Sequence, residues 1–223
     1  MVIRYIFKYL ANFFSKWDIY FIKSLAFDSQ DLKKIPINLD YVRHKTLELC
    51  SNEIYRFSIN GSVAELGVYK GEFASRINLA FPDRNLYLFD TFSGFDARDT
   101  GEEKNKSYSS GEQDFSDTNI QKVMKKMKYP EKCIIMKGYF PDSAVGIEDS
   151  FSFVSLDADL YNPILSGLEF FYSRLEKGGY IFVHDFNNSD YKGVREAVMK
   201  FCKEKIIGYI PIPDGGGSIV ITK

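Results

Sequence analysis

Two short apolar runs, each followed by a glycine turn or an acid, constrain this chain most strongly. The first lies in VAELGVYKG, residues 63–71, and leads through Gly67 and Gly71 into a helix-like segment. The second, LYLFDTF at residues 86–92, contains Asp90, 23 residues after Gly67. A strand, a glycine turn, a helix and a second strand that ends in a carboxylate are typical of the nucleotide-binding half of a doubly wound α/β domain, where the acid binds ribose hydroxyls. The alternative is an ordinary strand-turn-helix with a solvated acid.

Composition limits the class of protein. The 223 residues suit one domain of moderate size or one domain with an appendage, and 45% are hydrophobic, which is enough for a core. The net charge of −1 predicts no bulk attraction to nucleic acid. The three cysteines form no CxxC pair, so we expect neither a structural zinc site nor a disulfide framework. This cysteine usage predicts a cytoplasmic location.

The N-terminal segment, residues 1–27, is rich in aromatic and basic residues. Charged side chains interrupt it, so no run reaches the ~18 apolar residues that a membrane span needs, and no cleavage site follows an apolar core. We expect residues 1–60 to be a helical extension that packs on the domain or on a second copy in a homo-oligomer, or that closes over the site. Contact with a membrane surface is the alternative. Residues 61–223 are expected to form the cofactor-binding domain.

Strands and helices alternate beyond residue 60. A polar loop is expected at 96–118, with Asp117 as the N-cap of the next helix, and a hairpin around residues 215–217. The pattern predicts a Rossmann-like α/β fold, a mostly parallel seven-stranded sheet with a C-terminal antiparallel hairpin, which is typical of class I methyltransferases. Nicotinamide-binding domains usually continue with a sixth parallel strand. The expected strands are 62–66, 86–89, 133–136, 151–156 and 180–184, and the expected helices are 72–80, 118–127, 163–175 and 193–204.

Polar side chains follow several of these strands, at the sheet edge where such folds bind ligands. Asp157 follows the fourth strand, and His184 and Asp185 follow the fifth. These three groups could hold a divalent cation, or Asp157 or His184 could act as a general base. Because Mg²⁺ prefers oxygen ligands, the histidine leaves the identity of the ion, Mg²⁺ or Mn²⁺, and the need for it open.

Several segments together resemble one family, the macrocin O-methyltransferases, which are S-adenosylmethionine-dependent sugar O-methyltransferases of macrolide pathways and their bacterial relatives. The resemblance spans about residues 40–205 and is most specific in LFDTFSGF and SLDADLY. The segments are VAELGVYKGEFA, LYLFDTFSGF, QDFSDTN, KGYFPDS, FVSLDADLY and GGYIFVHDF, in that order.

The resemblance implies roles for individual residues. Glu65, Gly67 and Gly71 would frame the methionine part of S-adenosylmethionine, Asp90 would bind the ribose, and Phe115 and Ser116 would wall the adenine. Asp157 corresponds to the acid that ligates magnesium and serves as base, and Asp185 to a second acid, but His184 stands where the family has aspartate. The complete set expected to bind the cofactor is Glu65, Gly67, Tyr69, Gly71, Asp90, Thr91, Phe115, Ser116, Gly138 and Asp157.

The sequence therefore predicts an S-adenosylmethionine-dependent O-methyltransferase that acts on a sugar hydroxyl of a glycan, glycoside or nucleotide-sugar, in polysaccharide or natural-product biosynthesis. A catechol-type acceptor stays open. One alternative is an NAD-dependent oxidoreductase, although ELGVYKG lacks the second glycine of G-x-G-x-x-G. The other is a cofactor-binding interaction protein without turnover, although such a protein would not need both Asp157 and Asp185.

Overall fold

The computed structural model describes residues 10, 13–14 and 40–223. The predictions for residues 1–39, namely a helical extension, a subunit contact or a membrane-surface helix, lie outside the described residues. Residues 40–223 belong to one compact unit, which includes helix α2 (Tyr41–Arg56). The domain boundary after residue 60 stays a prediction. Among the described residues, no helix is long and apolar enough to span a membrane.

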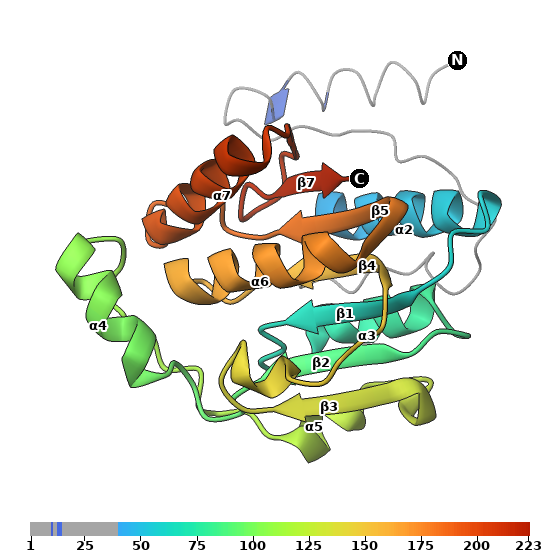
Figure 1. Cartoon of the computed structure of the whole chain (residues 1–223), viewed down its shortest axis with the longest axis horizontal. Coiled ribbons are helices and arrows are strands. Elements are labelled where there is room, and N and C mark those ends of the chain that lie inside the picture. Colours follow the sequence, from blue (N-terminus) through green and yellow to red (C-terminus); the bar gives the residue numbers. More distant parts are fainter. Residues whose placement is uncertain (1–9, 11–12, 15–39) are drawn as a thin grey trace. The chain divides into compact units, whose positions relative to one another are not determined.

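The described strands form one seven-stranded sheet in the order β3-β2-β1-β4-β5-β7-β6 (Figure 1). The first five strands along the chain are parallel, whereas β7 runs antiparallel to both β5 and β6, so the predicted sheet and hairpin are confirmed. The strands are β1 (Ser62–Leu66), β2 (Leu86–Asp90), β3 (Cys133–Lys137), β4 (Phe151–Leu156), β5 (Leu175–Val183), β6 (Ile210–Pro211) and β7 (Ile219–Thr222).

The chain reverses its direction of progress across the sheet between β1 and β4. From β1 it moves outward to β2 and β3, and it returns to the other side of β1 with β4. The carboxyl ends of β1 and β4 are therefore left beside a crevice, which is the usual place for a ligand in such sheets.

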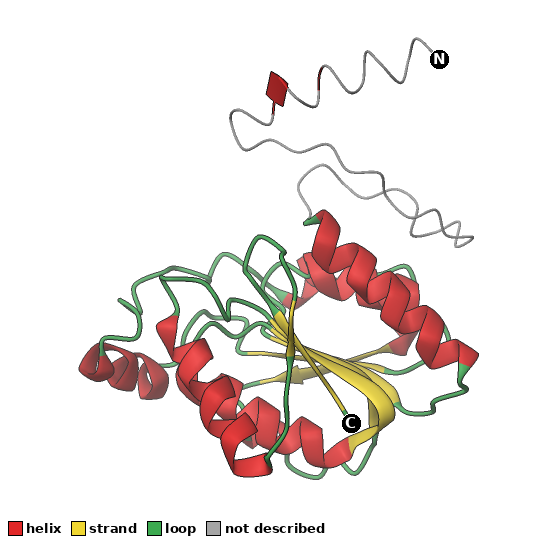
Figure 2. Cartoon of the chain, turned by 90° about the horizontal axis from the view of Figure 1, so that it is seen from above, coloured by secondary structure: helices red, strands yellow, loops and turns green. Residues whose placement is uncertain are grey.

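Helices cover both faces of the sheet (Figure 2). Helix α2 packs against α3 and β5, and α6 packs against α7, β4 and β5. The remaining helices are α3 (Glu72–Ala80), α4 (Ala97–Lys106), α5 (Ile120–Met124), α6 (Tyr161–Arg174) and α7 (Lys192–Lys205), with short 3-10 turns at Pro130–Lys132 and Asp142–Ala144.

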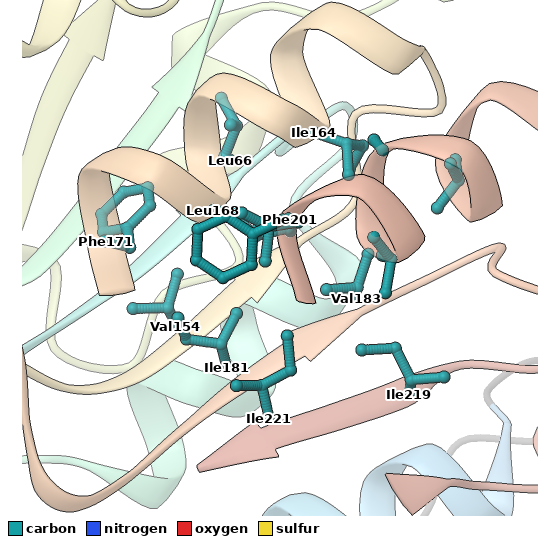
Figure 3. Packing of buried hydrophobic residues seen from close by; sticks show 14 of the residues in the cluster. Leu66, Val154, Ile164, Leu168, Phe171, Ile181, Val183, Phe201, Ile219 and Ile221 are labelled. Carbon is teal, nitrogen blue, oxygen red and sulfur yellow. The ribbon is translucent and has the colours of Figure 1, made fainter. Parts of the chain in front are cut away.

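The main core lies between the sheet and the helices α6 and α7 (Figure 3). Leu168 and Phe171 of α6 and Phe201 of α7 are fully buried against Val154 and Ile181. Each such side chain contributes about 1.5–3 kcal/mol by leaving water. This core fixes the carboxyl ends of β4 and β5.

Gly167 allows α6 to lie close to the sheet. A Cβ added at this position would lie 3.0 Å from Leu66 and 3.1 Å from Leu156. The close packing holds the N-terminal end of α6 directly beyond the tips of β1 and β4, where the crevice lies.

The prediction of a polar loop over residues 96–118 is wrong for its first part, because α4 occupies 97–106. Asp96 caps this helix through the N–H of Arg98 at 2.9 Å. Glu103 is buried and accepts the N–H of Tyr161 at 2.7 Å, which satisfies a free donor at the start of α6. Two acids of α4, Asp99 and Glu103, are therefore buried, which a polarity pattern cannot reveal.

Two other boundaries differ from the expected ones. Asn119, not Asp117, caps α5 by accepting the N–H of Lys122 at 2.9 Å, so the helix starts later than expected. Strand β5 begins at Leu175, directly after α6, and its register with β4 shifts between Phe151 and Phe153. Residues 176–179, which were expected to separate the helix from the strand, therefore belong to β5.

Candidate active site

A cavity of about 460 Å³ opens at the carboxyl ends of the five parallel strands, β1 to β5. Most of the residues predicted to form the site line this cavity: Glu65, Gly67, Tyr69, Asp90, Thr91, Phe115, Gly138, Asp157, His184 and Asp185. The structure brings them together from the carboxyl ends of the five parallel strands and, for Phe115, from the loop before α5. Gly71 and Ser116 are the predicted site residues that do not line it.

Gly67 allows two strand ends to meet. Its φ is +85°, and a Cβ at this position would lie 2.0 Å from the carbonyl oxygen of Asp157. No side chain fits there, because such a distance is far below van der Waals contact. Gly71 has φ +76° and begins α3, and a Cβ there would lie 2.9 Å from Val123 of α5. Gly71 is therefore needed for packing behind the cavity.

Asp90 stabilises the glycine turn by accepting hydrogen bonds from its backbone. Its Oδ2 accepts the N–H groups of Val68 and Tyr69, both at 2.8 Å, and its Oδ1 accepts the N–H of Phe92 at 2.6 Å. A carboxylate offers about four lone-pair positions, so this side chain can still accept from a hydroxyl in the cavity.

An aromatic wall stands beside Asp90. The ring of Phe115 makes edge contacts with Tyr69 and Phe95, at centroid distances of 5.0 and 5.1 Å. Ser116 is exposed beside this wall, and its N–H is donated to Asp114. The three rings offer an apolar surface next to the Asp90 carboxylate.

Glu65 is a buried acid that faces the cavity. The side chain is 2% exposed, and its Oε2 has no hydrogen-bond partner within the described part of the chain. Burial raises the pKa of this carboxyl well above its usual value, although the positive charge of Arg43 opposes the shift. An unpartnered buried carboxylate is costly, and a ligand ammonium group would relieve that cost.

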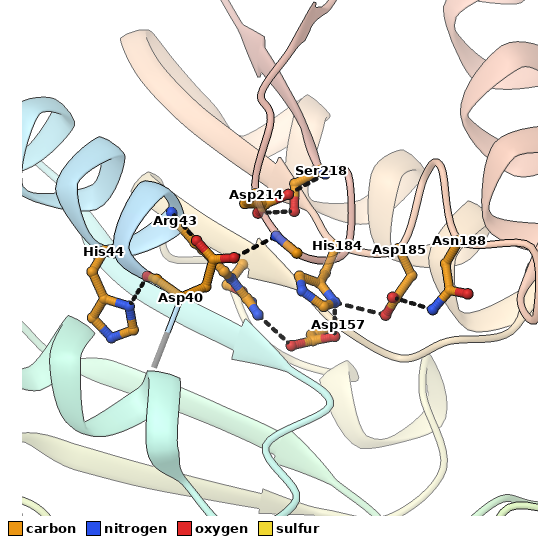
Figure 4. Close-up of polar contacts among 11 residues, drawn as sticks. Asp40, Arg43, His44, Asp157, His184, Asp185, Asn188, Asp214 and Ser218 are labelled. Atoms are coloured by element: carbon orange, nitrogen blue, oxygen red, sulfur yellow. Dashed lines mark hydrogen bonds and ion pairs between the residues drawn. The ribbon is translucent and has the colours of Figure 1, made fainter. Parts of the chain in front are cut away.

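Arg43, from α2, reaches the tip of β4 (Figure 4). Its Nη1 donates to Asp157 Oδ2 at 2.9 Å and its Nη2 to Ser155 Oγ at 3.1 Å, while the guanidinium lies 3.8 Å from the centre of the Phe73 ring. The sequence analysis did not place Arg43 at the site. One signal was available, because Arg43 shares a helix face with Leu47 and Cys50, which are buried.

His184 lies between two carboxylates. Its Nδ1 is 2.6 Å from Asp185 Oδ2 and 3.1 Å from Asp157 Oδ1. Burial alone would lower the pKa of His184, but Asp157 and Asp185 outweigh it and raise the pKa to about 10. The imidazole is therefore protonated near neutral pH, and Nδ1 donates to both acids.

Asp157 and its neighbour Asp159 differ in charge. Burial would raise the pKa of Asp157, but Arg43 and His184 hold it well below its usual range. Asp159 has φ +60° and also lines the cavity. Burial, followed by the charges of Asp157 and Asp185, raises the pKa of Asp159 well above its usual value. Asp157 is thus the ionised acid at the centre of the site.

The expected ligands of a divalent cation do lie together, with ligand atoms of Asp157, His184 and Asp185 within 4.8 Å of one another. Each carboxylate oxygen already has an N–H partner, because Asn188 donates to Asp185 Oδ1 at 2.8 Å. The Nε2 of His184 lies against Gly216, where a Cβ would be 2.5 Å away. The Arg43 guanidinium at one oxygen of Asp157 repels a divalent ion, and His184 Nδ1 occupies the space between the two acids, so the arrangement of donors in this structure does not fit such an ion.

The sheet order, the glycine turn and the carboxylate at the tip of β2 that holds this turn are those of a class I S-adenosylmethionine-dependent methyltransferase. The model of the macrocin O-methyltransferase (TylF) family matches residues 39–212, so the chain belongs to that family. The resemblance seen in the sequence is confirmed.

Solved structures of methyltransferases share the fold. The O-methyltransferase NovP is 18% identical, with 86% of each chain covered and a TM-score of 0.71. CalS11, a calicheamicin methyltransferase, is 18% identical with a TM-score of 0.63, covering 80% of this chain and 79% of its own. TomG from Streptomyces achromogenes, in complex with S-adenosylmethionine, is 14% identical with a TM-score of 0.54, and 96% of each chain is covered. The search of curated proteins gave no match.

The family membership confirms the prediction of an S-adenosylmethionine-dependent O-methyltransferase. Neither the nicotinamide oxidoreductase nor the non-catalytic interaction protein gains support from these comparisons.

Proposed function

We propose that this enzyme transfers the methyl group of S-adenosylmethionine to a hydroxyl of a sugar in a glycoside, a glycan or a nucleotide-sugar. The observation that carries the proposal is the position of Asp157, whose ionised carboxylate lies in the same cavity as Glu65, Gly67 and Asp90. The family match and the likeness to CalS11, described as a TDP-rhamnose 3′-O-methyltransferase, support a sugar as acceptor.

The residues of the cavity fit the cofactor. The unpartnered Oε2 of Glu65 would bind the ammonium of the methionine part, beside the Gly67 turn that lets the tips of β1 and β4 meet. Asp90 would bind the ribose diol, with Thr91 and Gly138 beside it, and the apolar wall that contains Tyr69 and Phe115 would hold the adenine. When bound, the sulfonium supplies an electrophilic methyl group.

The protein then has to align the acceptor and remove its proton. Asp157 would accept a hydrogen bond from the reacting hydroxyl, which fixes the direction of its lone pair. As the oxygen-carbon bond forms, the hydroxyl becomes strongly acidic, so even a carboxylate with a low pKa can take the proton. His184 holds a proton at rest, so in that state it stabilises Asp157 and does not act as the base.

The test is methyl transfer by the wild type and by Asp157→Asn, followed by mass spectrometry of the acceptor. We expect Asp157→Asn to abolish turnover and to leave the affinity for S-adenosylhomocysteine within a few-fold. Asp142→Asn is the matched control, because Asp142 is exposed and pairs with Arg98 outside the cavity. If Asp157→Asn keeps turnover, or loses cofactor binding, the role proposed for Asp157 is wrong.

The acceptor panel should include nucleotide-sugars, simple glycosides and a catechol. Methylation of a nucleotide-sugar or glycoside would support the proposal, and methylation of the catechol alone would contradict it. We propose in addition a cytoplasmic homo-oligomer. Light scattering of the purified full chain tests its oligomeric state, and a monomer at all concentrations would contradict that part.

A further inference from the structure

The Asp157 carboxylate is held between two positive side chains. Arg43 Nη1 lies 2.9 Å from one of its oxygens, and His184 Nδ1 lies 3.1 Å from the other (Figure 4). The family resemblance leads one to expect a divalent cation at this acid. Side-chain nitrogens of the protein already occupy both oxygens of Asp157, and one of them belongs to a guanidinium.

The Arg43 guanidinium is fixed in place by its surroundings. It is 7% exposed, it stacks on Phe73, and its second nitrogen donates to Ser155. Asp40 caps the same helix by accepting the N–H of Arg43 at 2.9 Å. Because a guanidinium stays protonated in proteins, this charge is permanent.

The loop of residues 214–218 closes the other side of His184. Asp40 accepts the N–H of Gly215, and Asn187 donates to the carbonyl of Gly217 at 2.9 Å. Gly216 lies directly against the imidazole ring. A divalent ion shared by the two acids would lie beside the Arg43 guanidinium and would have to displace His184 Nδ1 from between the carboxylates, and the loop opposes that displacement.

We propose that Arg43 replaces the divalent cation in this enzyme, so that methyl transfer proceeds without a metal. Arg43 is a positioning residue that acts through Asp157: it orients the carboxylate toward the acceptor hydroxyl and keeps it ionised. This inference rests on the proposed function for its effect on turnover. Its claim about metal binding is independent of any acceptor.

The first test is Mn²⁺ binding, followed by the paramagnetic resonance signal of the free ion. We expect the wild type to bind no ion at the site. The double variant Arg43→Gln/His184→Asp, which removes both cations and offers three carboxylates, should bind one equivalent, and adding Asp157→Asn should abolish that binding. One equivalent bound by the wild type and lost in Asp157→Asn would overturn the proposal. Binding of S-adenosylhomocysteine confirms that each variant is folded.

The second test is turnover in the presence of EDTA. The wild type should keep its full rate, while Arg43→Gln should lower kcat by about 100-fold, the effect of misplacing a reacting group, with the KM of the cofactor unchanged. Arg43→Lys should have a kcat roughly tenfold higher than that of Arg43→Gln, because lysine keeps the charge but not the planar guanidinium. Arg56→Gln on the same helix is the control, since Arg56 is largely exposed. Loss of wild-type turnover in EDTA that Mn²⁺ restores would overturn the proposal.

The two proposals fail in different ways. If no acceptor is methylated under any condition, the proposed function fails, and the Mn²⁺ measurement alone still decides the inference about Arg43. If methylation occurs but requires a divalent ion, the inference about Arg43 fails while the proposed function stands.

Discussion

The protonated imidazole of His184 makes the stability of the fold depend on pH. The unfolded chain has a histidine pKa of 6.5 and the folded chain one of about 10, so the folded state binds the proton more tightly. A raised pKa of this kind contributes stability that is complete below pH 6.5 and disappears as the pH rises through 10. The variant His184→Asn serves as the reference, because asparagine keeps an N–H donor at this position but cannot carry the charge.

The difference of 3.5 pH units corresponds to about 5 kcal/mol at most, with about 2 kcal/mol left at pH 8.5. This free energy belongs to the Asp157–His184 pair as a whole, so no separate contribution of Asp157 is added to it. Urea unfolding followed by circular dichroism, at pH 6.5, 8.5 and 10, measures it. We expect the free energy of unfolding of the wild type to approach that of His184→Asn as the pH rises. A constant difference between the two proteins from pH 6.5 to 10 would refute the reasoning.

Three further predictions concern other groups. Burial lowers the pKa of His44 to about 4, so the free energy of unfolding of the wild type should fall by up to about 3 kcal/mol as the pH falls from 6.5 to 4. His44→Asn should not show this fall, and urea unfolding of both proteins measures the difference. Gly67→Ala should prevent cofactor binding or folding, because its Cβ would lie 2.0 Å from a backbone oxygen, and a soluble variant with wild-type affinity for S-adenosylhomocysteine in calorimetry would contradict this. Glu103→Ala should lower the free energy of unfolding by about 1–3 kcal/mol, because the N–H of Tyr161 loses its buried acceptor, and unchanged urea unfolding would contradict that role.

The sequence predicted most of the sheet, and the reason is local. β1 and β4 are buried along their whole length and appear in the sequence as short, mostly apolar stretches, interrupted only by serines and by Glu65. The strand tips then follow from the chain order, which is why Asp157, His184 and Asp185 were expected together.

Features that depend on distant partners were not predictable. Helix α4 carries few apolar residues, and its buried acid Glu103 finds its partner on α6, 58 residues away in the chain. Arg43 and Asp157 are 114 residues apart, and only the folded structure brings this pair together. The residue that caps α5 likewise depends on distant partners. Asp117 accepts from Tyr69 and Lys70, and Asn119 caps the helix instead.

The measurement that tests the account most directly is calorimetric titration of the full chain with S-adenosylhomocysteine and, separately, with NADH, both in EDTA. The account predicts micromolar binding of S-adenosylhomocysteine without added metal, loss of that binding in Asp90→Ala, and no binding of NADH. Binding of NADH, or of neither ligand, would contradict the assignment of the cavity as a methyltransferase site.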